Sequence, residues 1–252
     1  MIIPGIVSVT FRKHTADEIV KMAAAASLSA IEWGADVHAK VGETENALSV
    51  GRITRDAGLC PISYGSYFWC GYEGEHGDFA EVISTAEALG AANIRSWAGK
   101  KASDTVDDAE FAFVASEIAK RCDEAAAHGM TLSLEYHPNT LTDCKESAVR
   151  LAKAVDRDNL RLYWQPNFEL SDADNLAALE AVLPWLSNVH VFSWLGAGAA
   201  RYPLAHSRSL FRSCADMIRS DGRDHGMLLE FVKGDDPAQM AEDAEALLGI
   251  IG

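Results

Sequence analysis

Residues 131–140, TLSLEYHPNT, decide how the rest of the chain is interpreted. Ser133, Glu135 and His137 alternate with apolar residues, and a β-strand sends alternate side chains to opposite faces of its sheet. Pro138 has no backbone N–H to donate, so the strand is predicted to stop there. A carboxylate at the end of an apolar strand is costly to bury without a partner. Glu135 therefore predicts a site that other segments of the chain complete.

The same order of a strand-like run, a polar loop and an amphipathic helix recurs along the whole chain. The strand-like runs are residues 5–11, 29–34, 60–67, 93–97, 131–140, 160–165, 188–194 and 227–232. Helices are expected over residues 15–26, 44–57, 78–89, 105–128, 145–155, 172–183 and 209–218, and from 236 to the C-terminus. Thr15 and Glu18 have the spacing of a capping box at the first helix.

Strands that alternate with helices are expected to be parallel, and eight such units fit the usual length of a (β/α)8 TIM barrel. We predict an α/β chain with a single barrel domain over residues 1–252. The alternative is an open doubly wound sheet. Such a sheet usually carries a glycine fingerprint after its first strand, and VTFRKHT (9–15) lacks one.

Composition and charge narrow the classes of partner. The apolar content of 48% and charged content of 23% are typical of a soluble globular protein. The net charge of −15 would repel phosphate backbones, so we expect no nucleic-acid partner. There is no run of roughly 18 apolar residues, so no membrane partner is expected. Five scattered cysteines without a CxxC pair, and no signal peptide, indicate reduced thiols and a cytoplasmic protein.

Polar side chains stand near the C-terminal ends of several predicted strands, where the chemistry of such barrels is located. They are Glu32, Arg95, Lys100, Glu135, His137, Gln165, Asn167, His190 and Glu230. Two carboxylates, one imidazole and one amide oxygen from strands five to eight suit a divalent metal ion of the Mn, Mg, Co or Zn type. This pattern predicts a metal site formed by Glu135, Gln165, His190 and Glu230.

Taken singly, these residues have plainer interpretations. A lone His190 is typical of a hydrogen-bonded core histidine, and one buried Glu could pair with Arg95 or Arg161 as a structural ion pair. Glu32, Lys100 and His137 fit either substrate contact or a structural polar network. The combination on four neighbouring strands favours a site.

Seven segments together carry a resemblance to a known family. They are AIEWGADVH (30–38), ISYGSYF (62–68), IRSWAG (94–99), LSLEYHPNTLTD (132–143), LYWQPN (162–167), VHVFSW (189–194) and LLEF (228–231). The chain resembles the xylose isomerase-like TIM barrels, which include sugar phosphate isomerases, ketose 3-epimerases, hydroxypyruvate isomerase, inosose dehydratase and endonuclease IV. The resemblance covers essentially the whole chain.

The resemblance implies one Mn²⁺-like ion held by Glu135, Gln165, His190 and Glu230. The sequence departs from the family pattern at two positions: Gln165 stands in place of the usual Asp, and Phe168 in place of a substrate-binding His. An amide oxygen is a neutral and weaker ligand than a carboxylate. Two Glu and a His can still hold an ion, with water completing its shell.

The function that the resemblance implies is a metal-dependent isomerase or epimerase that acts on a carbohydrate or sugar phosphate through an enediolate. Glu135 and Glu230 are predicted as its acid–base pair, because they lie on non-adjacent strands across the barrel mouth. Aromatic walls are predicted from Trp33, Tyr67, Trp97 and Trp194. The predicted substrate-binding residues are Glu32, His38, Trp97, Lys100, His137, Asn167 and Arg201.

Arg201 lies in the loop of residues 196–208, where it could bind a phosphate or carboxylate or simply be a surface arginine. Three other functions stay open: a dehydratase of a polyol or inosose, a phosphodiesterase of the endonuclease IV kind, and a non-catalytic sugar-binding barrel. The acidic charge and the single strand-seven His argue against the phosphodiesterase. If the chain forms a homodimer, we expect pairing through the outer helices.

Overall fold

The computed structural model describes residues 1–72, 78–195 and 200–252. Its barrel strands are β1 (Ile2–Val7), β2 (Ala30–Gly34), β3 (Cys60–Cys70), β4 (Asn93–Ala98), β5 (Thr131–Glu135), β6 (Leu160–Trp164), β7 (Leu186–Val191) and β10 (His225–Leu229). They pair in parallel and close in the order β1-β10-β7-β6-β5-β4-β3-β2. The predicted TIM barrel is confirmed.

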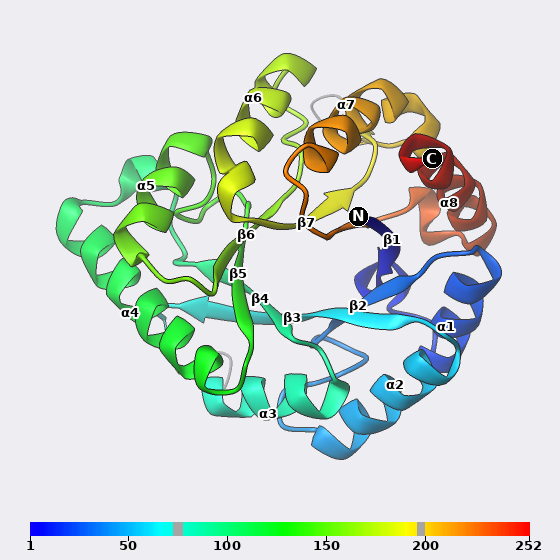
Figure 1. Cartoon of the computed structure of the whole chain (residues 1–252), viewed down its shortest axis with the longest axis horizontal. Helices are drawn as coiled ribbons and strands as arrows, with labels where there is room; N and C mark the ends of the chain where they lie inside the picture. Colours follow the sequence, from blue (N-terminus) through cyan, green and yellow to red (C-terminus); the bar gives the residue numbers. More distant parts are fainter. Residues whose placement is uncertain (73–77, 196–199) are drawn as a thin grey trace.

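Helices surround the closed sheet (Figure 1). In the described ranges they are α1 (Ala16–Ala25), α2 (Thr44–Asp56), α3 (Phe79–Leu89), α4 (Asp108–Ala127), α5 (Lys145–Val155), α6 (Asp172–Val182), α7 (Arg208–Arg219) and α8 (Pro237–Ile251). None of them is both long and apolar enough to cross a membrane.

Local signals in the sequence set several of these boundaries. The capping box at α1 is confirmed, since Thr15 accepts from the backbone of Glu18 while Glu18 accepts from the backbone of Thr15. The helix expected over 105–128 begins at Asp108 instead, because the Asp107 side chain caps it by accepting from a backbone N–H. The first strand lies earlier in the chain than predicted: it runs from Ile2 to Val7, and Ser8–Phe11 forms a 3-10 helix.

The alternation within β5 separates two environments. Leu132 and Leu134 are fully buried in the main core between the strands and the helices. Ser133 points into the barrel, where its hydroxyl donates to Asn93 Oδ1 (2.6 Å). Glu135 therefore also points inward, at the end of the strand where the barrel opens.

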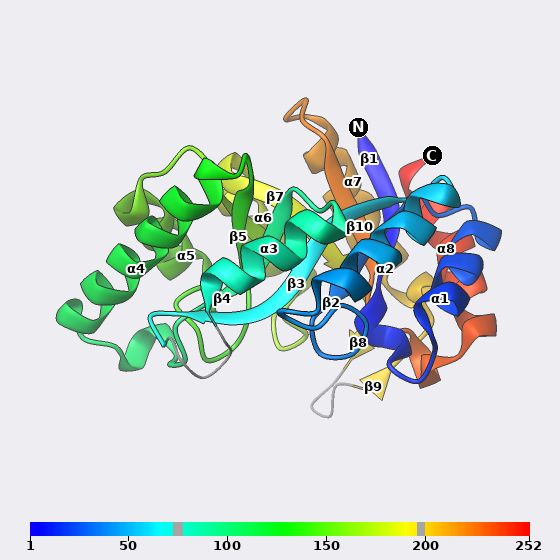
Figure 2. The ribbon, with the colours of Figure 1, turned by 90° about the horizontal axis from the view of Figure 1, so that it is seen from below.

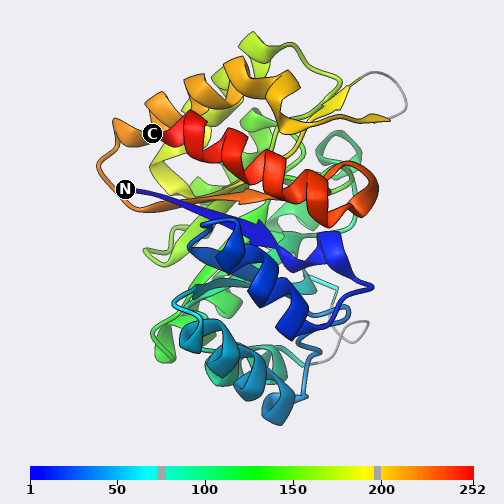
Figure 3. The same cartoon turned by 90° about the vertical axis from the view of Figure 1, so that its right-hand side faces the viewer.

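The two ends of the barrel differ in what lies beside them. The hairpin of β8 (Trp194–Leu195) and β9 (Ala200–Arg201) projects beyond the C-terminal ends of the strands (Figure 2). The start of β1 and the end of α8 lie near each other at the opposite end (Figure 3). Of the predicted loop 196–208, residues 196–199 lie outside the described residues.

Candidate active site

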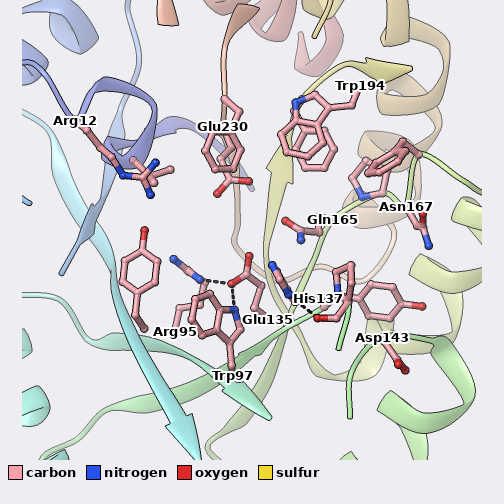
Figure 4. A pocket seen from close by; sticks show the side chains of 18 residues that line it. Arg12, Arg95, Trp97, Glu135, His137, Asp143, Gln165, Asn167, Trp194 and Glu230 are labelled. Atoms are coloured by element: carbon pink, nitrogen blue, oxygen red, sulfur yellow. Dashed lines mark hydrogen bonds and ion pairs between the residues drawn. The ribbon is translucent and has the colours of Figure 1, made fainter. Parts of the chain in front are cut away.

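A cavity of about 200 Å³ opens at the C-terminal end of the barrel strands. Its lining is aromatic on the walls and charged or polar on the floor (Figure 4). The polar lining residues are Arg12, Arg95, Glu135, His137, Asp143, Gln165, Asn167 and Glu230, and the aromatic ones are Tyr67, Trp97, Tyr136, Phe168, Phe192, Trp194 and Phe231.

His190, on β7, is fully buried and lies against three of the residues that line the cavity. Its Nδ1 lies 3.1 Å from Gln165 Oε1, 3.5 Å from Glu230 Oε2 and 3.6 Å from Glu135 Oε1. One ligand atom each from Glu135, His190 and Glu230 fits within 4.8 Å of the others. The structure therefore brings the four predicted metal ligands together around one point.

The other ring nitrogen of His190 faces away from this point. Nε2 lies 3.5 Å from Glu32 Oε1 and has no hydrogen-bond partner among the described residues. Histidine ligands of metals commonly donate their second N–H to a carboxylate, which fixes the tautomer. The side-chain oxygens near Nδ1 and Nδ1 itself are ligand types that Mn, Mg, Co or Zn ions accept. The residues present therefore fit such an ion.

Arg95 on β4 links two of the carboxylates. Its Nε donates to Glu32 Oε1 (2.8 Å), and its Nη1 donates to Glu135 Oε2. Trp97 Nε1 donates to the same Glu135 oxygen at 2.5 Å. Oε2 of Glu135 is thus occupied by two donors, while Oε1 faces His190.

The surroundings push the pKa values of the two cavity carboxylates apart. Burial would raise the pKa of Glu135, but the Arg95 guanidinium outweighs it and lowers that pKa to about 2. Burial raises the pKa of Glu230 to about 7 in spite of the nearby His190. Burial would lower the pKa of His190, but the carboxylates of Glu230, Glu135 and Glu32 raise it to about 10. A metal ion at Nδ1 would replace that proton.

Of the predicted substrate-binding residues, Trp97, His137 and Asn167 line the cavity. Glu32 is fully buried beneath it, so direct contact with a substrate does not fit its position. His38 is also buried outside the cavity, where its Nε2 lies 3.0 Å from the His14 carbonyl oxygen.

Lys100 and Arg201 lie beside the cavity and do not line it. Lys100 Nζ stands 5.4 Å from the Trp69 ring, in a neighbouring groove that shares Tyr67 and Trp97 with the cavity. Arg201 pairs with Asp235 (2.6 Å) in an adjoining cleft.

Tyr67, Trp97 and Trp194 form walls as predicted, but Trp33 does not. It is fully buried and donates to Thr54 Oγ1 (3.1 Å) on α2. Because Glu32 points into the barrel, its neighbour on the strand must point outward. Strand parity therefore rules out Trp33 and Glu32 sharing the cavity.

Sequence reasoning missed Arg12, Asp143 and Phe231 as lining residues. Arg12 follows a 3-10 turn, and Phe231 follows β10 with φ of 48°, a left-handed conformation that is uncommon for an aromatic residue. Tyr67 has a similar φ of 56°. Strained backbone of this kind gathers at functional sites, and no sequence signal announces it.

A family model described as xylose isomerase-like TIM barrel matches residues 20–248. The chain belongs to this family. Among curated proteins it is similar to a 3-dehydroshikimate dehydratase of Bacillus anthracis, with 32% identity over 126 residues. That match covers 45% of this chain and 43% of the dehydratase, which is less than half of either.

Solved structures of the same barrel shape include enzymes of two classes. A probable 3-DHS dehydratase of Bacillus anthracis has a TM-score of 0.79 at 19% identity and covers 98% of each chain. A D-psicose 3-epimerase of Clostridium cellulolyticum has a TM-score of 0.74 at 13% identity, covering 98% of this chain and 97% of that one. A 3-keto-D-glucoside 4-epimerase of E. coli has a TM-score of 0.73 at 16% identity and covers 99% of each chain. Likeness at these identities shows the fold alone.

Proposed function

We propose that this chain is a metal-dependent enzyme that removes a proton next to the carbonyl group of a small polyhydroxylated ketone, and that loss of water follows. The observation that carries this proposal is the inequality of the two cavity carboxylates. Glu135 Oε2 accepts from two donors, whereas the ion-pair contact described for the Glu230 carboxylate is with His190, at 3.5 Å. One carboxylate is fixed and the other is able to exchange a proton.

Glu135, Gln165, His190 and Glu230 would hold the divalent ion. Bound there, it would supply Lewis-acid polarisation of the substrate carbonyl, which makes the neighbouring C–H more acidic. Glu32 would keep the His190 ring in the orientation that points Nδ1 at the ion.

Glu230 is the proposed general base, since neither Arg95 nor Trp97 donates to its carboxylate as both do to that of Glu135. It would accept the proton from the carbon beside the carbonyl. Glu135, with its pKa lowered to about 2, is better suited to a ligand role than to the proton transfer that the sequence predicted for it.

His137 is the proposed acid for the departing hydroxyl. Its Nδ1 lies 2.8 Å from the Pro138 carbonyl oxygen, which can only accept, so Nδ1 carries a proton and donates. In the imidazolium form Nε2 carries a second proton, which it would give to the departing hydroxyl to form water, leaving neutral His137 with its remaining proton on Nδ1. Its ring lies 5.4 Å from the ring of Trp97 at the cavity wall.

Dehydration is favoured over epimerisation because a two-base epimerase needs a second carboxylate free to return a proton. Similarity to 3-dehydroshikimate dehydratase supports the same choice. The second candidate is the isomerase or epimerase implied by the sequence, which the likeness to sugar epimerases keeps open. In either case the aromatic walls suit the C–H faces of a carbohydrate-like ring.

Purified protein loaded with Mn²⁺, Mg²⁺, Co²⁺ or Zn²⁺ tests the proposal, with 3-dehydroshikimate and a panel of ketohexoses offered in D₂O. Dehydration of 3-dehydroshikimate would give an aromatic product detectable by ultraviolet absorbance, and epimerisation would incorporate deuterium into recovered sugar. Glu230→Gln should abolish either reaction, and Glu180→Gln on the exposed face of α6 is the control. Epimerisation without loss of water from any substrate would favour the second candidate. Turnover unaffected by Glu230→Gln would refute both.

A further inference from the structure

A second cleft, of about 240 Å³, adjoins the cavity at the barrel mouth. We call it the mouth cleft, and its charged lining residues are Arg12, Lys13, His14, Arg201 and Asp235. Val9, Arg12 and Phe231 line both the mouth cleft and the cavity. A ligand seated on the cavity floor could therefore extend into the mouth cleft.

Arg201 is held in a defined orientation. Its Nη1 donates to Asp235 Oδ1 (2.6 Å), and its guanidinium carbon lies 4.9 Å from the Phe231 ring centre and 5.9 Å from that of Trp194. Both rings also line the cavity. Stacking and one ion pair fix a planar guanidinium in advance, so less entropy is lost when its other donors bind a ligand.

Arg12 approaches from the other side of the same opening. Its Nε donates to the Asp36 carboxylate, and its side chain extends beside Glu230, across from Trp194 (Figure 4). A guanidinium carries five N–H donors. The ion pairs with Asp36 and Asp235 engage one nitrogen of each arginine, so neither uses the whole donor set.

The charge of the mouth cleft contrasts with that of the chain. The protein carries a net charge of −15, yet Arg12, Lys13 and Arg201 gather here against the carboxylates of Asp36 and Asp235. The lining comes from segments that follow β1, β7 and β10, and the loops after the seventh and eighth strands are where TIM barrels frequently bind phosphate. A neutral sugar would need no such cluster.

We propose that the mouth cleft binds an oxyanion group of the substrate, a carboxylate or a phosphate, between Arg12 and Arg201. The carbonyl end of the same molecule occupies the cavity floor. This inference builds on the proposed function for the reaction, but it is a statement about binding and can be tested without turnover.

Two pairs of ligands provide the test, and within each pair one member carries the anionic group that the other lacks. They are 3,4-dihydroxybenzoate with catechol, and fructose 6-phosphate with fructose. Calorimetry on the Mn²⁺-loaded protein should show that the charged member of at least one pair binds roughly ten- to a hundred-fold more tightly, since hydrogen bonds to charged groups contribute this much. The pair that shows the preference identifies the group as carboxylate or phosphate.

Arg201→Gln and Arg12→Gln should each remove most of that preference, and Arg201→Lys, which keeps the charge without the planar fork, should restore part of it. Arg150→Gln is the matched control, because Arg150 also pairs with an aspartate, Asp108 (2.7 Å), and stacks on an aromatic ring, Phe111 (3.8 Å). Thermal unfolding of each variant checks that it is folded.

Equal binding of both members of both pairs, or no binding of either charged ligand, would overturn the inference. So would a preference that persists in Arg12→Gln and Arg201→Gln. A preference that depends on these arginines, in a protein that dehydrates and epimerises nothing, would uphold the mouth cleft while the proposed function fails.

Discussion

The two ends of the barrel differ in how fully their polar side chains are hydrogen-bonded. At the N-terminal end, the Asp221 carboxylate accepts from Arg223 Nε (3.0 Å), Nη2 (2.7 Å) and backbone N–H (2.8 Å), and lies 3.0 Å from His225 Nε2. At the C-terminal end, Glu32 Oε2, Tyr163 OH and His190 Nε2 are buried without a hydrogen-bond partner among the described residues.

The difference separates stability from function. An unpaired buried polar group costs about 1–3 kcal/mol, so a fold optimised for stability alone would pair these atoms as it pairs Asp221. These three unpaired atoms belong to side chains gathered around His190, beneath the cavity, where they set the orientation of the imidazole that faces the proposed metal site. Variants at the two ends should therefore have opposite effects on turnover and on stability.

The largest expected effect is on turnover at the C-terminal end. Glu230→Gln should lower the rate roughly 10²- to 10⁴-fold, because it removes the proposed base. It should leave the free energy of unfolding unchanged or slightly higher, since a buried carboxylate with few partners is replaced by an amide. Steady-state kinetics and urea unfolding measure both quantities, and a variant that loses stability together with activity would contradict the contrast between the ends.

Arg95→Met should destabilise the protein by about 3–5 kcal/mol, because it leaves Glu32 and Glu135 as unpaired buried carboxylates. Mn²⁺ should recover part of this loss by supplying positive charge near Glu135. The control is Arg150→Met, which breaks an exposed ion pair of at most about 1 kcal/mol. Equal unfolding midpoints in urea for the two variants would mean that Arg95 does not hold the site together.

At the N-terminal end, Asp221→Asn should cost roughly 1–3 kcal/mol of stability through lost hydrogen bonds to Arg223 and His225. The rate per folded molecule should not change, because Asp221 lies at the opposite end of the barrel from the cavity. Differential scanning calorimetry and kinetics at a temperature well below unfolding test this pair of outcomes. A fall in rate without a fall in stability would show that the two ends are coupled.

The smallest effect is a change in acid stability. Burial would raise the pKa of Asp221, but donors from Arg223 and His225 lower it to about 2, below the value of about 3.9 in an unfolded chain. A lowered folded pKa means that the stabilisation is present above about pH 4 and is lost as the pH falls toward 2. Asp221→Asn should flatten the unfolding curve in this window. Asp216→Asn, at a mostly exposed ion pair, should leave it unchanged.

Much of the fold could be predicted because its signals are local. The alternation in residues 131–135 and the capping box at Thr15 depend only on neighbours along the chain. That Glu135, Gln165, His190 and Glu230 would meet was also predictable, since each stands at or near the C-terminal end of a strand. Parallel strands of a closed barrel bring those ends together.

Local signals do not show which side chains from distant segments of the chain form contacts with one another. Arg95 was recognised as a potential ion-pair partner, but only the barrel register places it between Glu32 on β2 and Glu135 on β5. Arg12 enters the cavity from a turn after β1, and nothing in its local sequence distinguishes it from a surface arginine.

The amino-acid sequence by itself determined the eight strand–helix units, the closed barrel and the residue types gathered at its mouth. These features depend on the periodicity of apolar residues and on the spacing of strands and helices, which are local properties of the chain. Only the tertiary structure decided that Arg95 donates to the carboxylate of Glu135 and not to that of Glu230. That distinction arises from contacts across the barrel, and side chains distant in sequence meet there only after the sheet has closed.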